Sequence, residues 1–251
     1  MKLYGLIGFP LSHSFSVGYF KQKFEKENIV DSEYRNFEIP SIELLKEVIA
    51  SNPELIGLNV TIPYKEQVIP YLDELDEAAR EIGAVNTIKI FRKGSSFKLK
   101  GYNTDVYGFK ETLKPLLKNN HQKALILGTG GAAKAVEYVL KNIGLDVVYI
   151  SRNPENANEK SYTELNEIAI RNFPVIINSS PLGMYPKVDA CPDIPYQFIN
   201  SNNLLYDLIY NPAETLFLKK GKEKGALIQN GLAMLQLQAE KAYEIWTSNN
   251  Y

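Results

Sequence analysis

The chain has 251 residues, of which 45% are hydrophobic and 23% are charged, as in an ordinary soluble protein. Its 28 basic and 29 acidic residues leave a formal charge of −1, so neither nucleic acid nor an anionic membrane is an expected partner. A single cysteine, Cys191, excludes an internal disulfide and a cysteine-rich zinc site, and two histidines argue against a histidine-built metal centre. We therefore expect no bound metal. No apolar run reaches membrane-spanning length and no signal peptide is evident, which predicts a cytoplasmic protein.

Strand-like and helix-like segments alternate along the first hundred residues. Short strands are predicted at 3–8, 34–39 and 55–62, and a hairpin joins the strands 87–91 and 97–100 through a loop at 92–96. Helices are predicted at 16–27 and 41–50, the second with Ser41 as its N-cap.

A second pattern of alternating strands and helices begins after a helix-like segment at 105–118. Short apolar strands are separated by helices, which indicates a parallel sheet covered on both faces. The predicted strands lie at 124–127, 147–150, 175–177, 204–206 and 226–228. The sequence therefore predicts a two-domain α/β protein. The first domain would comprise residues 1–105, with a mixed sheet completed by a C-terminal helix at about 232–251, and the second would be a Rossmann-type domain of residues 106–231.

A glycine-rich turn stands between the strand 124–127 and the following helix. Read as G-x-G-x-x-A, it places Gly128 at the turn, Gly130 where pyrophosphate approaches closely and Ala133 at the helix–strand contact. The next strand ends at residues 149–153 without the acidic residue that binds the ribose hydroxyls of NAD, and Arg152 offers a planar cation for a 2′-phosphate. We therefore expect NADP(H) as the cofactor.

Two serines, Ser14 and Ser16, stand at the start of the first helix. Hydroxyls and free amides at a helix start can bind a carboxylate, but both serines can equally serve only as caps. The residues alone leave both interpretations open.

The chain as a whole resembles the shikimate dehydrogenase family. The resemblance is carried by motifs that occur in family order: Gly8-Phe9-Pro10 with His13-Ser14-Phe15-Ser16, Asn59-Val60-Thr61-Ile62-Pro63-Tyr64-Lys65, Gly83-Ala84-Val85-Asn86-Thr87, Asn103-Thr104-Asp105, Gly128-Thr129-Gly130-Gly131-Ala132, Asn178-Ser179-Ser180-Pro181-Leu182-Gly183-Met184, Asp207-Leu208-Ile209-Tyr210-Asn211-Pro212 and Gly231 to Gln238. It implies reversible NADPH-dependent reduction of 3-dehydroshikimate to shikimate, a step of aromatic amino-acid (chorismate) biosynthesis, in a monomer or homodimer.

The same resemblance assigns roles to individual residues. It implies Lys65 and Asp105 as the catalytic pair; Ser14, Ser16 and Tyr210 at the substrate carboxylate; and Thr61, Asn86, Asp105 and Gln238 at the ring hydroxyls. The implied cofactor contacts are Glu77, Gly128, Thr129, Gly130, Gly131, Ala132, Ser151, Arg152, Leu208 and Gly231.

Lys65 fits this chemistry physically. Hydride arriving at a ketone carbon leaves negative charge on the oxygen, which a lysine ammonium both stabilises and protonates. Asp105 would keep that lysine charged despite desolvation, and Pro63 would stiffen the chain before it. An isolated lysine at a helix start is more often simply solvated, and a lysine can also form a Schiff base with a ketone, although hydride reduction requires none.

Three alternatives remain at this stage. The chain could be a quinate/shikimate dehydrogenase that uses NAD, which Arg152 argues against. It could be a non-catalytic ligand sensor, which would need no proton donor such as Lys65. A two-domain folate dehydrogenase is a more distant possibility that would not need the paired serines.

Overall fold

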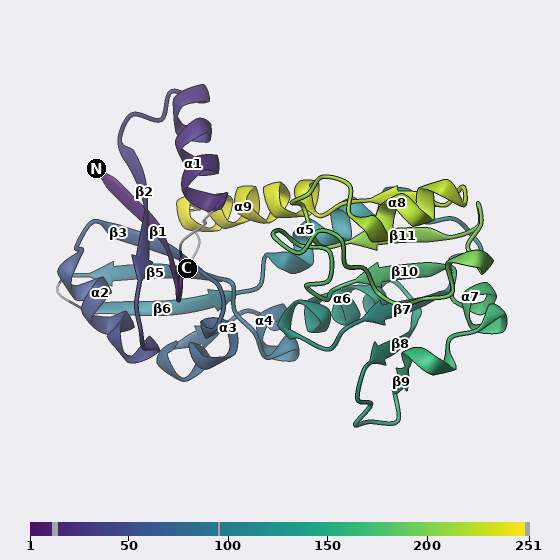
Figure 1. Ribbon diagram of the computed structural model, residues 1–251. Helices are drawn as coiled ribbons and strands as arrows, with labels where there is room; N and C mark the ends of the chain where they lie inside the picture. The colour runs from purple at the N-terminus through teal and green to yellow at the C-terminus, as the bar shows by residue number, and fades with distance from the viewer. Residues whose placement is uncertain (12–14, 95, 249–251) are drawn as a thin grey trace. The chain divides into compact units, whose positions relative to one another are not determined.

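Two β-sheets organise the part of the chain that the structure describes (Figure 1). The computed structural model describes residues 1–11, 15–94 and 96–248. The chain divides into two compact units, the first formed by Met1–Thr104 with Gln238–Tyr251 and the second by Asp105–Leu237. Within the described residues, none of the helices has both the length and the apolar character needed to cross a membrane.

The first unit contains a mixed sheet in the order β2-β1-β3-β5-β6-β4. Its strands are β1 (Lys2–Gly8), β2 (Ser32–Glu38), β3 (Leu55–Val60), β4 (Glu74–Leu75), β5 (Thr87–Lys93) and β6 (Ser96–Tyr102), and its helices are α1 (Phe15–Lys26), α2 (Leu45–Ser51), α3 (Tyr64–Gln67) and α4 (Glu77–Ile82). Strand β1 pairs in parallel with β2 and β3, whereas β5 runs antiparallel to both β3 and β6. The parallel arrangement brings the ends of β1 and β3 to the same edge of the sheet.

Helices cover both faces of this sheet. On one face, apolar residues of β1, β3 and β5 pack against the segments that contain α2, α3 and α4. On the other face, α1 and the C-terminal part of α9 (Leu232–Thr247) pack through an aromatic cluster that includes Phe20, Tyr34 and Trp246. A Cβ on Gly57 of β3 would lie 2.2 Å from the Trp246 ring, so glycine is required for this approach.

The second unit contains an entirely parallel sheet in the order β12-β11-β10-β7-β8-β9. Its strands are β7 (Lys123–Leu127), β8 (Asp146–Ser151), β9 (Glu159–Ser161), β10 (Val175–Asn178), β11 (Leu204–Asp207) and β12 (Leu227–Gln229), and its helices are α5 (Asp105–Leu113), α6 (Gly131–Asn142), α7 (Glu167–Asn172) and α8 (Leu216–Glu223). This is the doubly wound strand order of dinucleotide-binding domains, in which ligands bind where the order reverses, here between β7 and β10. The predicted two-domain α/β fold with a parallel second sheet is confirmed.

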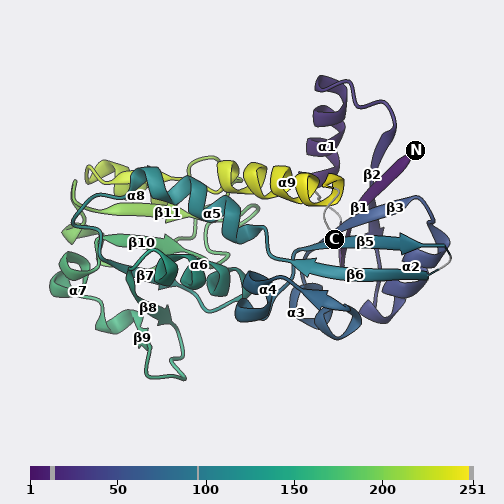
Figure 2. The ribbon, with the colours of Figure 1, turned by 180° about the vertical axis from the view of Figure 1, so that it is seen from behind.

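Successive residues of each central strand point to opposite faces of the second sheet, as a period of two requires. On one face, Ala124 and Ile126 pack with apolar residues of α5, α6 and α9. Figure 2 shows α5 and α6 over this face of the sheet. On the other, Leu125 and Leu127 pack with apolar residues of α7 and α8. Burial on both faces explains why these strands read as continuous apolar runs in the sequence.

Several element boundaries differ from those predicted. Ser41 does cap its helix, but the first turn, Ile42–Leu44, is a 3₁₀ helix and α2 follows it. The hairpin strands extend further, so β5 ends at Lys93 and β6 begins at Ser96. The helix predicted at 105–118 ends at Leu113 and continues only as a 3₁₀ turn, because Pro115 lacks a backbone donor.

Candidate active site

The segments that follow β1 and β3 meet at one edge of the first sheet. The amide of Thr61 donates to the Ile7 carbonyl at 3.0 Å, and the amide of Phe9 donates to the Ile62 carbonyl at 3.2 Å. A Cβ on Gly8 would lie 2.5 Å from the Thr61 methyl group, so these two segments are in close contact. The fold therefore places the predicted substrate residue Thr61 beside the chain that leads into α1.

Lys65 lies on a short helix that is fixed on both sides. The preceding residue, Tyr64, is buried and its hydroxyl donates to the Ile39 carbonyl at 2.6 Å. The Lys65 carbonyl accepts a hydrogen bond from the Val85 amide at 2.7 Å. The side chain of Lys65 is half-buried. Its backbone is thus held by the core, and the position of its side chain does not depend on Pro63 alone.

A chain of buried hydrogen bonds connects the strands of the first unit to the predicted substrate residue Gln238. The Tyr34 hydroxyl donates to Asn59 Oδ1 at 2.8 Å, and Asn59 Nδ2 donates to Thr87 Oγ1 at 3.3 Å. Thr87 Oγ1 lies 3.2 Å from Thr104 Oγ1, which donates to Gln238 Oε1 at 3.4 Å. The structure therefore links the predicted residue Gln238 to β2, β3 and β5 through residues that sequence reasoning did not assign.

Asn86 joins this chain through its side-chain oxygen. Asn86 Oδ1 accepts hydrogen bonds from the Thr104 amide at 2.7 Å and from Thr87 Oγ1 at 3.0 Å, and it lies 3.1 Å from Thr104 Oγ1, whose one hydrogen it shares with Gln238. Because these donors occupy that oxygen, Nδ2 is the part of the amide that can donate to a ligand hydroxyl. The network thus fixes both the position and the orientation of Asn86.

The two serines differ in what the structure says of them. Ser14 lies outside the described residues, as does the neighbouring His13. Ser16 is half-buried in the first turn of α1. Burial raises the pKa of Tyr34, and a hydrogen bond with Ser16 opposes that effect, so Ser16 contacts the same hydroxyl that anchors Asn59. Ser16 therefore adjoins the buried network.

Asp105 is the first residue of α5 and is half-buried. A carboxylate in the first turn interacts favourably with the positive end of the helix dipole. The preceding residue, Thr104, is held by Asn86, which fixes the chain where α5 begins. Lys65 belongs to the first unit and Asp105 opens the second, and their catalytic pairing stays a prediction.

The glycine-rich turn connects β7 to α6 at the point where the strand order reverses. Gly128 has φ 104°, which favours glycine, and Gly130 is the N-cap of α6. A Cβ on Gly130 would meet no atom within 4 Å, whereas Ala133 is fully buried. The turn itself is held by Ser179, whose hydroxyl donates to the Leu127 carbonyl at 2.9 Å. Thr129 is exposed, and Gly131 and Ala132 open the helix. This geometry fits a pyrophosphate, because open space adjoins the backbone amides of a helix start.

Strand β8 ends at Ser151, with no acidic residue at its end. The Ser151 hydroxyl accepts from the Asn153 amide at 3.2 Å, which shapes the turn that carries Arg152. Arg152 is exposed. Burial raises the pKa of Tyr162, and the nearby Arg152 opposes that rise. The cation therefore stands at the strand end where a 2′-phosphate is expected.

Asp207, at the end of β11, holds the loop that carries two further predicted residues. Its Oδ1 accepts from Asn178 Nδ2 and from the Ile209 amide, both at 3.0 Å, and its Oδ2 accepts from the Thr215 hydroxyl at 2.6 Å. Burial raises the pKa of Asp207 to about 6, and these hydrogen bonds oppose the rise. Leu208 and Tyr210 follow directly, the latter 37% exposed.

The remaining predicted cofactor residues, Gly231 and Glu77, lie in different units. A Cβ on Gly231 would lie 2.1 Å from the Leu208 carbonyl oxygen, so the two predicted nicotinamide residues are in contact. Glu77, by contrast, is an exposed residue at the start of α4 in the first unit.

A doubly wound parallel sheet, an open glycine turn at the start of α6 and a cation at the end of the second strand define a protein with a Rossmann-type dinucleotide-binding unit. Residues 6–88 match the family model of the shikimate dehydrogenase substrate-binding domain. A shikimate dehydrogenase (NADP(+)) of Clostridium beijerinckii is 43% identical over 98% of this chain and 92% of the relative. The chain belongs to the shikimate dehydrogenase family.

Solved structures agree with this assignment. A chorismate mutase/shikimate 5-dehydrogenase fusion protein from Clostridium acetobutylicum is 40% identical, with a TM-score of 0.85, over 98% of this chain and 91% of that chain. Shikimate 5-dehydrogenase from Thermus thermophilus, solved in complex with NADP(H) and shikimate, is 30% identical, with a TM-score of 0.84, over 98% of this chain and 94% of that chain.

Proposed function

We propose that this chain catalyses the reversible NADPH-dependent reduction of 3-dehydroshikimate to shikimate, with Lys65 and Asp105 as its acid–base pair. The observation that carries the proposal is full-length similarity to NADP(+) shikimate dehydrogenases together with the presence of both residues. The first unit would bind the substrate and the second the cofactor.

The second unit has the features that NADP(H) requires. The turn at Gly128, Gly130 and Gly131 would hold the pyrophosphate on the N-terminus of α6, and Ser151 and Arg152 would bind the 2′-phosphate. Leu208 and Gly231, which touch each other, would line the nicotinamide site. When bound, NADPH supplies the hydride that reduces the ketone.

The first unit offers polar groups that suit a hydroxylated ring with a carboxylate. Asn86 and Gln238, both fixed by Thr104, would bind ring hydroxyls together with Thr61. Ser16 and Ser14 would bind the carboxylate together with Tyr210. Because the buried network fixes Asn86 and Gln238 before substrate arrives, binding would cost little side-chain ordering.

Lys65 would stand at the ketone oxygen. Its ammonium would stabilise the developing negative charge and transfer a proton from Nζ to that oxygen, while Asp105 would keep the amine charged and oriented. An ammonium in this role is worth about 3–4 kcal/mol of transition-state stabilisation in a site that excludes water.

Substitution of Lys65 tests the assignment. Lys65→Met should lower kcat for shikimate oxidation by roughly 10²- to 10⁴-fold while changing KM for shikimate much less, because the proton transfer is lost and the binding contacts stay. The exposed Lys46→Met is the matched control and should behave as wild type. Comparable turnover in Lys65→Met would refute the acid–base role, and no turnover in the wild type would favour a ligand sensor.

Arg152 separates the NADP enzyme from a quinate/shikimate dehydrogenase that uses NAD. Arg152→Ala should raise KM for NADPH and leave KM for NADH nearly unchanged, because only NADPH carries the 2′-phosphate. An equal loss with both cofactors would remove Arg152 from this role. Assays of wild type with shikimate and quinate, each with NADP⁺ and NAD⁺, complete the comparison.

The cellular setting is part of the same proposal. A chain with one cysteine and a near-neutral charge suits a cytoplasmic enzyme that acts on a small molecule, without nucleic acid or membrane as partner. Either a monomer or a homodimer is compatible with this proposal.

A further inference from the structure

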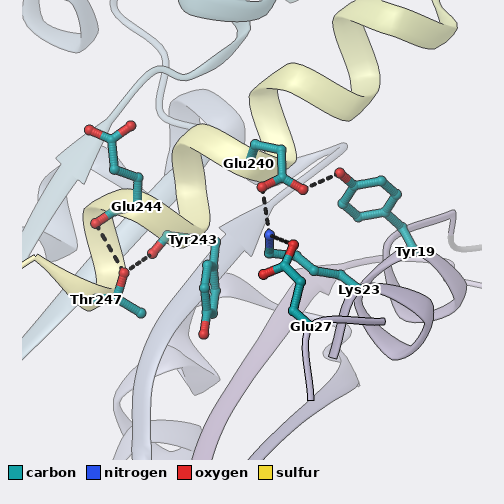
Figure 3. A network of polar contacts seen from close by, with 7 residues as sticks. All are labelled: Tyr19, Lys23, Glu27, Glu240, Tyr243, Glu244 and Thr247. Atoms are coloured by element: carbon teal, nitrogen blue, oxygen red, sulfur yellow. Dashed lines mark hydrogen bonds and ion pairs between the residues drawn. The ribbon is translucent and has the colours of Figure 1, made fainter. Parts of the chain in front are cut away.

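One partly buried polar cluster lies outside every role assigned above. It joins α1 to α9 within the first unit and centres on Glu240 (Figure 3). Glu240 Oε1 accepts a hydrogen bond from the Tyr19 hydroxyl, and Oε2 accepts from Lys23 Nζ at 2.7 Å. Lys23 Nζ also donates to Glu27 Oε1 at 2.7 Å. Each carboxylate oxygen of Glu240 is thus bound by a different side chain of α1.

Lys23 is buried and pairs with two carboxylates. Its side chain is 7% exposed, which is rare for a lysine unless it is paired. Burial lowers the pKa of Lys23, but the hydrogen bonds with Glu240 and Glu27 outweigh this effect and raise the pKa overall. Burial and the bond to Glu240 raise the pKa of Tyr19, so its hydroxyl stays a donor. At neutral pH Lys23 therefore stays charged, and the Tyr19 hydroxyl stays protonated.

The helices that this cluster joins are those that carry substrate residues. Tyr19 and Lys23 stand on successive turns of one face of α1, and Ser16 stands one turn before Tyr19 on that face. Glu240 follows Gln238 by two residues on α9. Any displacement of one helix along the other would therefore change the distance from Ser16 to Gln238.

Trp246 fixes α9 on the sheet, because its Nε1 donates to the Ile88 carbonyl at 2.9 Å, so the contacts between α1 and α9 decide the distance to Ser16. The helices also touch through aromatic rings, with Phe20 and Trp246 centroids 5.7 Å apart and Phe24 and Tyr243 centroids 5.8 Å apart. Aromatic pairs accept a range of ring separations, whereas two charge-assisted hydrogen bonds from successive turns set a single register. The aromatic cluster holds the helices together, and the hydrogen bonds to Glu240 define the register of α1 relative to α9.

We propose that Glu240, bound by Lys23 and Tyr19, is a positioning residue that sets the register of α1 on α9 and so the spacing between the carboxylate contact Ser16 and the hydroxyl contact Gln238. This inference rests on the proposed function. Shikimate is a rigid ring that carries its carboxylate and hydroxyls at fixed separations, so an error in this spacing weakens binding of the substrate and not of the cofactor.

The test is the variant Glu240→Gln, for which KM is measured for shikimate and for NADP⁺. KM for shikimate should rise about tenfold, the equivalent of one charge-assisted hydrogen bond, while KM for NADP⁺ stays unchanged. Tyr19→Phe removes only one of the two bonds and should give a smaller rise; it also serves if Glu240→Gln does not fold. The matched control is Glu244→Gln, one turn further along α9, where an exposed carboxylate pairs with Lys241.

A positioning role predicts coupling to Ser16. In a Ser16→Ala background, Glu240→Gln should raise KM for shikimate much less than in wild type, because the contact it positions is already absent. Additive effects, or equal rises in both KM values with a lower melting temperature, would overturn the proposal and leave a purely structural ion pair. Unchanged kinetics in an active Glu240→Gln enzyme would also overturn it, whereas an inactive wild type would refute the proposed function and this inference with it.

Discussion

A substitution at Gly130 should weaken cofactor binding without changing the stability of the fold. Its backbone has φ −72° and ψ 177°, which any residue adopts, and a Cβ there would meet no atom within 4 Å. Gly130→Ala should therefore leave the free energy of unfolding within about 1 kcal/mol of wild type, because reduced unfolded-state entropy offsets a weaker N-cap. The same methyl group would occupy the space through which the pyrophosphate must approach the α6 amides.

The cost then falls on binding alone. A methyl group forced against a ligand costs about 1–3 kcal/mol, as in other overpacked sites, which corresponds to roughly 5- to 150-fold weaker NADPH binding. Fluorescence titration with NADPH measures the dissociation constant, and urea unfolding measures stability.

Gly144→Ala is the matched control for this experiment. Gly144 also has open space around its Cβ position, but its φ is 87°. Its replacement should cost about 1 kcal/mol of stability through backbone strain and should not change NADPH affinity. If Gly130→Ala binds NADPH as wild type does, the glycine turn is not the pyrophosphate site; if it is strongly destabilised, the space around Gly130 is not open.

Three further predictions concern stability, each measured by urea unfolding. Gly57→Ala should lower the free energy of unfolding by about 3 kcal/mol, because the added Cβ would lie 2.2 Å from the Trp246 ring. Gly18→Ala is the control: a Cβ there would meet no atom within 4 Å, so the change should be neutral or stabilising. Burial lowers the pKa of His121, so its contribution to stability is present above about pH 6.5 and is lost as the pH falls; His121→Gln should remove this slope between pH 7 and pH 5. Burial raises the pKa of Asp207 to about 6, so stability should fall as the pH rises from about 4 to about 6, and Asp207→Asn should flatten the profile there.

Local patterns in the sequence were sufficient for much of the fold. Short apolar runs separated by helices predicted the parallel sheet, because strands buried on both faces lack alternation. Ser41 was correctly predicted as a cap, and the strand–turn–helix around Gly128 has the predicted form, because both depend on neighbouring residues. Boundaries were less exact, since pairing beyond the apolar core lengthened β5 and β6.

The buried network around Asn86 could not be predicted in the same way. Tyr34 and Asn59 are separated by 25 residues, and Thr104 and Gln238 by 134, so no local pattern connects them. Their contacts depend on which strands pair and in which register. Tyr34 in particular reads as an ordinary residue of a half-buried strand, although its hydroxyl joins Ser16 to Asn59.

Strand register explains how two hydrogen-bonded pairs of polar side chains form, one pair in each sheet. In the first sheet, Asn59 and Thr87 are directly opposite on β3 and β5, and their side chains are hydrogen-bonded. In the second sheet, Asn178 and Asp207 are directly opposite at the ends of β10 and β11, and their side chains are hydrogen-bonded as well. In each case the polar pair stands at an end of the sheet that adjoins loops with predicted site residues: β3 ends and β5 begins at the first pair, and β10 and β11 both end at the second.

A slip of one residue would turn these side chains to the opposite face, break the pair and leave buried polar groups without partners, at a cost of about 1–3 kcal/mol for each group. The same pairs that specify register therefore also hold the loops of the candidate site, and the chain cannot misalign its strands without losing the site.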